Sequence, residues 1–133
     1  NTLRMTMNKY RDKSDFEINK AVAEYYLTRE YRFNSADEIV ELIDIDLSCE
    51  FGGKINLVDT QVVGTFDPCN NAADAMPIVI ENGICMNYID KDIGWGARHF
   101  DEEKGELEIY DKNYYRAAMI CFLMMKEAES EKV

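Results

Sequence analysis

The 133-residue sequence lacks the marks of several protein classes. Its longest apolar run, 117–125, is far shorter than the roughly 20 residues of a membrane-spanning helix, and no signal peptide is recognised at its start. Its four cysteines form no CxxC pair, which favours free thiols in a reducing cytosol over disulfides or a zinc site. It also has no internal repeat, low-complexity segment or linker, so we expect one domain, residues 7–133, with 1–6 as an extraneous segment.

A catalytic signature is also missing. His99 is the single histidine, and the sequence has neither a Ser or Cys nucleophile motif nor a carboxylate pair at a telling spacing. General acid–base or nucleophilic catalysis needs such groups in a defined arrangement. We therefore predict that the protein is not an enzyme, with no catalytic residue, no metal site and no cofactor.

Basic residues are few relative to acidic ones: 15 Lys and Arg stand against 26 Asp and Glu, for a net charge of −11. Such a charge repels nucleic-acid backbones and anionic membrane surfaces at long range. We expect neither direct nucleic-acid binding nor membrane binding. A basic protein partner and simple solubility both remain open as reasons for the acidity.

Three helices are predicted. Ser14 and Glu17 form a capping box before an apolar stripe with helical spacing, which indicates a helix over 15–27. Asn71 as N-cap and Asp74 at the third position start a second, short helix, and Gly83 ends it in the left-handed conformation. A third helix is expected over 113–129.

The remaining segments read mainly as strands. Alternating side chains, or apolar runs bounded by turn residues, indicate strands over these ranges: 42–50, 55–58, 61–66, 84–89, 94–100 and 106–110. A short helix or turn is expected near 36–41, turns at 52–53 and 90–93, and a turn or bulge at 59–60. The predicted fold is α+β: an antiparallel sheet packed with a long apolar C-terminal helix and two shorter helices.

The C-terminal helix carries no polar residue over 117–125. A helix that is apolar all round must be covered all round. Either the sheet wraps it, or a second copy of the protein covers the rest. We expect a homo-oligomer on this ground, because apolar patches of that size are uncommon on monomers.

A candidate ligand-binding set combines helix amides, one aromatic ring and cations. Its members are Asn70, Asn71, Trp95, Arg98, His99 and Arg116. The first two precede a helix N-terminus, where free amides suit a phosphate. A base stacked on Trp95, with Arg98 or His99 on its phosphate, would form a nucleotide site. Arg116 lies in the first turn of a helix and needs an anion there.

Each member of this set also has an ordinary structural explanation. Asn71 is a good N-cap, and Asn70 suits the loop before it. Trp95 can pack over the sheet with Arg98 at the surface. The anion for Arg116 can be the Asp111 carboxylate or a bound phosphate.

Three stretches resemble the NinX-like family of small tailed-phage proteins, named for the nin region of lambdoid phage genomes. They are 14–24, 66–82 and 110–125. Two positions depart from the family pattern: Ala72 stands where Pro is usual, and Met76 where Trp is usual. The resemblance implies a phage accessory protein of the host bacterial cytoplasm, and it implies no particular biochemical activity.

Together these features lead to one functional expectation and one alternative. The first is a non-enzymatic sponge that counters host defence by sequestering a nucleotide-derived immune signal, of cyclic-nucleotide or ADP-ribose type. The alternative is an acidic inhibitor that binds a host protein, in the manner of a DNA mimic. A sponge needs a basic pocket inside the acidic shell, whereas a DNA mimic spreads its carboxylates along one elongated face.

Overall fold

A computed structural model describes residues 9–46, 59–103 and 105–130. Residues 9–11 are helical and lead into nine further elements. The predicted α+β class, with antiparallel strands and a long C-terminal helix, is confirmed. In chain order the elements are α2 (Asp15–Tyr26), β1 (Tyr31–Asn34), β2 (Ile39–Asp46), β3 (Asp59–Phe66), α3 (Ala72–Glu81), β4 (Cys85–Asp90), β5 (Gly94–Asp101), β6 (Gly105–Asp111) and α4 (Tyr114–Ser130).

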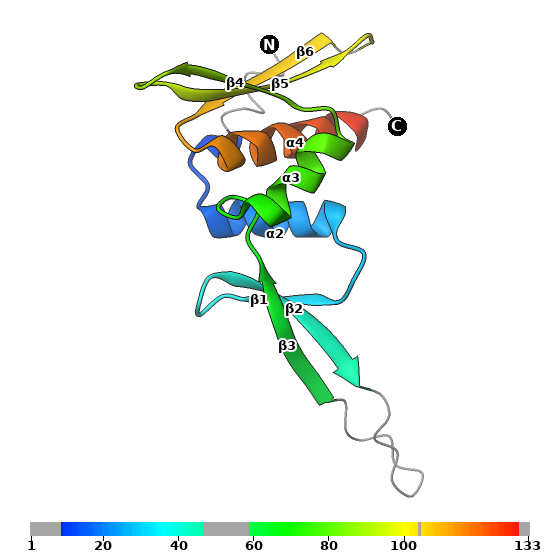
Figure 1. The fold of residues 1–133 in the computed structure, drawn as a ribbon. Helices are drawn as coiled ribbons and strands as arrows, with labels where there is room; N and C mark the ends of the chain where they lie inside the picture. Colours follow the sequence, from blue (N-terminus) through cyan, green and yellow to red (C-terminus); the bar gives the residue numbers. More distant parts are fainter. Residues whose placement is uncertain (1–8, 47–58, 104, 131–133) are drawn as a thin grey trace, which may run out of the picture.

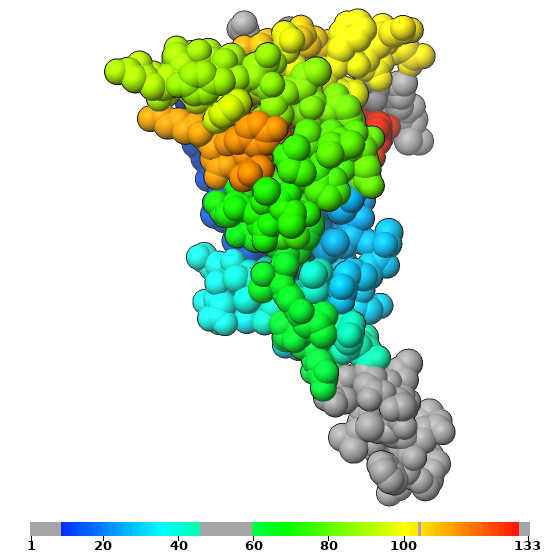
Figure 2. Space-filling view, in the orientation of Figure 1, coloured from blue at the N-terminus to red at the C-terminus, as the bar shows by residue number. Residues whose placement is uncertain are grey.

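The strands form two separate sheets where the sequence led us to expect one. Each sheet has three antiparallel strands in chain order, β1-β2-β3 and β4-β5-β6. Figure 1 shows the helices stacked between them, with β4–β6 at one end of the molecule and β1–β3 at the other. In the space-filling view the same two groups lie at opposite ends of the described residues (Figure 2).

Helix α4 is the centre of the core. All nine residues from Ala117 to Met125 are buried. Strands β5 and β6 pack on one side of the helix, and α2 and α3 pack on it as well. The chain therefore covers this apolar helix by itself, which is the first of the two possibilities that the sequence left open. The homo-oligomer stays a prediction, but α4 no longer supplies a reason for it.

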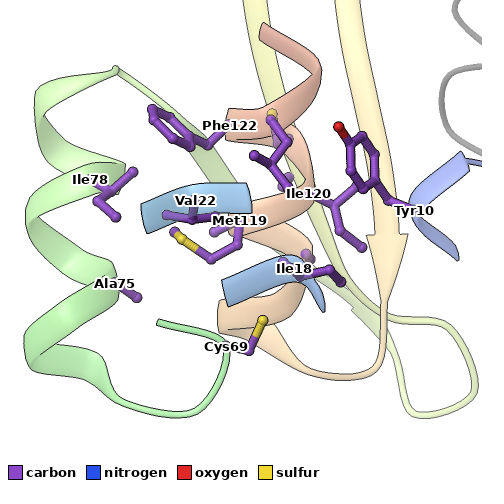
Figure 3. Packing of buried hydrophobic residues seen from close by; sticks show 14 of the residues in the cluster. Tyr10, Ile18, Val22, Cys69, Ala75, Ile78, Met119, Ile120 and Phe122 are labelled. Atoms are coloured by element: carbon purple, nitrogen blue, oxygen red, sulfur yellow. The ribbon is translucent and has the colours of Figure 1, made fainter. Parts of the chain in front are cut away.

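The helices meet in one apolar cluster, part of which is shown in Figure 3. The cluster includes Ile18 and Val22 of α2, Ile78 of α3, and Met119 and Phe122 of α4. Burial of these side chains from three helices is the main stabilising term of the fold.

The predicted helix ends are confirmed. Ser14 Oγ accepts a hydrogen bond from the amide of Glu17 at 3.1 Å, and Asn71 Oδ1 accepts one from the amide of Ala73 at 2.9 Å. Gly83 follows α3 with φ +63°, in the left-handed region that favours glycine.

The segment before α3 differs most from the sequence prediction. Residues 35–38 form the turn between β1 and β2, with Glu38 at φ +56°, so the turn alternative is correct and the helix alternative near 36–41 is wrong. Strand β1 was not predicted at all. Residues 59–60, expected as a turn or bulge, belong to β3. The irregularity in pairing lies at Val63 of β3, because Leu42 of β2 pairs with Gly64 and Ile43 pairs with Val62. The local capping pattern at 35–38 does not start a helix, because strand pairing, which depends on contacts between residues distant in sequence, determines the structure of this segment.

Several predictions lie outside the described residues. These are the extraneous segment 1–6, Cys49, the turn at 52–53 and the strand at 55–58.

Candidate functional site

Arg116 is held entirely by groups of the protein. Its Nη1 donates to Asp15 Oδ1 at 2.6 Å, and its Nε donates to Asp111 Oδ2 at 3.1 Å. Its Nη2 donates to three backbone carbonyls, those of Tyr10 (3.4 Å), Arg11 (3.3 Å) and Lys13 (2.5 Å). The side chain is only 13% exposed. The anions for this cation are thus two carboxylates, one of them the predicted Asp111, and each of the three guanidinium nitrogens already donates within the chain.

The N-terminus of α4 is capped from within the chain as well. Asn113 Oδ1 accepts from the amides of Tyr115 at 2.9 Å and Arg116 at 3.2 Å. The Asn113 side-chain amide donates back to the carbonyl of Cys69 at 3.0 Å, in the loop before α3. The amides that would attract an anion at this helix end are therefore used by one asparagine.

Asn70 joins this loop to α2. Its Nδ2 donates to Asp15 Oδ2 at 3.1 Å and to Asp67 Oδ1 at 3.1 Å. The structure thus brings Asn70 and Arg116 together, because both bind the carboxylate of Asp15. Asn71 lies beside Asn70 and acts as the cap of α3. The structural explanations considered for both asparagines are confirmed.

A buried asparagine that the sequence analysis missed completes the network. Asn19 of α2 donates to Asp67 Oδ1 at 2.7 Å and accepts from the amide of Cys69 at 3.1 Å. Asp74 Oδ2 accepts from the amide of Asp67 at 2.9 Å. The available signal was a polar residue adjoining the apolar stripe of α2, since buried polar side chains are nearly always hydrogen-bonded.

Burial dominates the acid–base behaviour of this region. It raises the pKa of Asp74, partly opposed by the hydrogen bond from the Asp67 amide, and the nearby Asp67 carboxylate raises it further. Burial also raises the pKa of the Cys69 thiol well above its usual range. A thiol with a raised pKa is a poor nucleophile at neutral pH.

Trp95 belongs to a row of aromatic rings at the N-terminal end of α4. Its ring lies 5.2 Å from Tyr88 and 4.9 Å from Tyr114, both edge to face, and Tyr114 lies 5.1 Å from Tyr115. The half-buried Trp95 therefore packs over the sheet and against the start of α4. Base stacking on this ring remains a prediction.

Arg98 and Trp95 lie on opposite faces of β5. Trp95, Ala97 and His99 alternate with Gly96 and Arg98, and Ala97 is fully buried on the side of α4. Arg98 Nη1 pairs with Glu106 Oε1 at 3.4 Å on the other side of the sheet. A base stacked on Trp95 would therefore not bring its phosphate to Arg98. His99 shares the face of Trp95 but lies four residues further along the strand, near the C-terminal half of α4.

Three hollows in the described surface contain members of the candidate set, and none carries an excess of positive charge. The first lies beside His99 and includes Asp101 and Glu129. The second, of about 130 Å³, includes Asn70 together with Asp15, Glu38 and Asp67. The third, of about 250 Å³, is lined by Asn87, Tyr88, Ile89, Gly96, Arg98 and Glu108, and we call it the Arg98 hollow.

The sequence analysis also missed the surface that β4–β6 presents away from α4, here called the outer face. Ala97, Leu107 and Ile109 are buried toward the core, so their neighbours in the strands point outward. Among the described residues, no helix or strand covers this side of the sheet in Figure 1. The outer face includes Asn87, Arg98, Phe100, Glu106, Glu108 and Tyr110.

Within 9–46, 59–103 and 105–130, no cluster of three or more His, Cys, Asp or Glu side chains could hold a metal ion. No helix of the same residues is long and apolar enough to cross a membrane.

Comparison with known protein families gives a match. The family model described as "Bacteriophage P22, NinX" matches residues 9–126, which is most of the chain and includes both sheets, α2, α3 and most of α4. No curated protein and no solved structure matches the chain.

Proposed function

Because the chain belongs to the NinX family of bacteriophage proteins, we propose that it is an accessory protein that counters host defence by binding a protein of the host. It acts in the host bacterial cytoplasm and without catalysis. The observation that carries the proposal is the pairing of Arg116. This residue is the most buried cation of the candidate set, and it is neutralised by Asp15 and Asp111. A phosphate-bearing ligand therefore loses its best binding group.

The charge distribution supports a protein partner. The net charge of −11 raises the local concentration of basic proteins and opposes the approach of phosphates. About half of it belongs to the β4–β6 sheet, where residues 85–111 carry eight carboxylates against three basic side chains. Long-range attraction of this kind increases the rate of association with a basic surface.

Sequestration of a cyclic-nucleotide or ADP-ribose-type signal is the second candidate, and the Arg98 hollow favours it. This hollow offers about 250 Å³, and its lining includes Arg98, Asn87 and Tyr88. Glu108 lies in the same hollow and opposes a phosphate there.

One purification separates the two candidates. The tagged protein is isolated under native conditions from phage-infected or defence-activated host cells and weighed by native mass spectrometry. The protein-binding function predicts a retained host protein at a fixed stoichiometry, which dissociates as the salt concentration rises. A heat-released nucleotide with no retained protein would favour sequestration, and recovery of the unbound 15.4 kDa chain alone would contradict both.

A matched pair of variants checks the second candidate directly. Arg98→Ala removes a side chain that is 46% exposed and pairs with Glu106 at 3.4 Å; Arg29→Ala removes one that is 44% exposed and pairs with Asp44 at 3.3 Å. Calorimetry with cyclic dinucleotides, cyclic trinucleotides and cyclised ADP-ribose species would show at least tenfold weaker binding for Arg98→Ala alone. Equal affinities of the two variants would exclude the Arg98 hollow as the binding site.

A further inference from the structure

The outer face of β4–β6 combines exposed apolar side chains with carboxylates. Phe100 is 69% exposed and Tyr110 is 46% exposed, although both are large hydrophobic residues within strands, each one residue before the end of its strand. Isolated exposed side chains need no explanation, but several on one sheet face mark a contact surface. Ile89 of β4, the strand on the other side of β5 from β6, is a third exposed apolar side chain of this group.

Gly96 explains how the apolar part is put together. A Cβ placed on Gly96 would lie 3.2 Å from Cε1 of Tyr110 and 3.4 Å from Cδ1 of Ile89. The two side chains thus lean toward each other over the glycine, from β6 and β4, and form a low apolar ridge across the central strand β5, toward the end of the sheet that carries the β4–β5 turn. A larger residue at this position would push them apart.

Carboxylates surround the ridge. Glu106 and Glu108 lie on β6, and the Tyr110 hydroxyl donates a hydrogen bond to Glu108. Arg98 of β5 is the one cation named on this face, and it pairs with Glu106 at 3.4 Å, so the carboxylates remain in excess. Both hairpin turns are acidic, with Asp90 and Asp92 at one end of the sheet and two glutamates, 102 and 103, at the other. A partner must therefore bring an apolar centre and a basic border.

The size of the outer face matches one helix. Strand β5 has eight residues, so the face is about 26 Å long, and three strands give it a width of about 10 Å. A helix has a diameter of about 10–12 Å and covers 26 Å with about 17 residues. A partner strand would instead add to the edge of β4 or β6, because backbone hydrogen bonds are made at the edge and not on the face.

The sign of the charge decides against other occupants. A second copy of this chain would bring the same acidic sheet against the first, and like charges in contact cost free energy. Nucleic acids and anionic membranes carry the same sign of charge and are repelled as well.

We propose that the outer face binds a cationic amphipathic helix of the host protein, an inference that rests on the proposed function. Apolar residues of the helix pack on Phe100 and on the ridge of Tyr110 and Ile89. Lysines or arginines along its two borders pair with Glu106, Glu108 and the turn carboxylates. The sheet then lies between two helices, α4 on its inner side and the partner helix on its outer side.

The test uses two synthetic 17-residue peptides as probes. Both contain the same leucines, lysines and arginines; one places the leucines in a single helical stripe, and the other has them scrambled. Fluorescence anisotropy at increasing salt measures their affinity for the full chain. The proposal expects the striped peptide to bind at least about tenfold more tightly than the scrambled one. Equal affinities would overturn it, because charge alone would then explain the binding.

Matched variants locate the contact. Phe100→Ala is paired with Ile80→Ala on α3, whose side chain is 72% exposed against 69% for Phe100. Glu106→Gln is paired with Glu17→Gln on α2, since these side chains are 47% and 48% exposed and each pairs with one basic residue. We expect affinity to fall about tenfold for Phe100→Ala and about threefold for Glu106→Gln, with less than twofold change for either control. Equal effects of test and control variants would overturn the location, and far-UV circular dichroism checks that every variant is folded.

The same variants separate this inference from the proposed function. A host protein that is retained equally by wild type and by Phe100→Ala and Glu106→Gln would leave the function standing and refute the outer face as its site. Striped-peptide binding at the outer face without any retained host protein would support the outer face as a site for a cationic amphipathic helix and refute the function.

Discussion

Replacement of Arg116 by Met tests whether this residue is structural. The substitution keeps much of the apolar stem and removes five hydrogen bonds, two of them to carboxylates. Removing one partner of a buried ion pair costs about 3–5 kcal/mol. The carboxylates of Asp15 and Asp111 are 42% and 24% exposed and regain hydration, so we expect a loss of about 2–3 kcal/mol.

Two further variants divide that loss into charge and geometry. Arg116→Lys keeps the charge but cannot bind two carboxylates and three carbonyls at once, so we expect a loss of about 1 kcal/mol. In a double-mutant cycle with Asp15→Asn, the coupling energy should be about 1–2 kcal/mol.

Urea unfolding followed by far-UV circular dichroism measures these differences, provided that the m value stays constant. Arg98→Ala is the control, with an expected loss below about 0.5 kcal/mol because its ion pair is exposed. A loss below about 0.5 kcal/mol for Arg116→Met would refute the structural assignment. It would return Arg116 to the ligand-binding candidates.

Four other outcomes are expected. Gly94→Ala should destabilise the protein well beyond Gly105→Ala, because both glycines have positive φ but a Cβ at Gly94 would lie 2.4 Å from backbone; thermal unfolding compares the two. A thiol reagent at pH 8 should modify exposed Cys85 before Cys121, whose pKa burial raises to about 12, and unreduced, denatured protein should show four thiols. The pKa of the Asp74 carboxyl is raised in the folded state, so the protein becomes less stable as pH rises through the unfolded and then the folded pKa of this group. The free energy of unfolding of Asp74→Asn should therefore rise relative to that of wild type between acidic and neutral pH. A difference that stays constant in pH-dependent urea unfolding would contradict this. Sedimentation tests the homo-oligomer prediction, which a 15.4 kDa monomer at micromolar concentration would refute.

The sequence by itself determined the elements whose signals are local. The α2 and α3 helices carry their own caps at Ser14 and Asn71, and α4 is recognisable from its apolar stretch, so their bounds agree with prediction within a residue or two. The hairpin strands β4 to β6 alternate and are bounded by turns, and they were located in the same way. Asp111 as the partner of Arg116 was within reach because the two are five residues apart.

Only the tertiary structure decided how these elements share their surfaces. The division into two sheets, the β1 strand and the enclosure of α4 depend on contacts between residues far apart in the chain, which no local pattern encodes. The second carboxylate that binds Arg116 belongs to Asp15, which is 101 residues away in the sequence. The candidate binding set was divided for a related reason: strand pleating places Trp95 and Arg98 on opposite faces of β5, and which face is left open follows from where α4 packs.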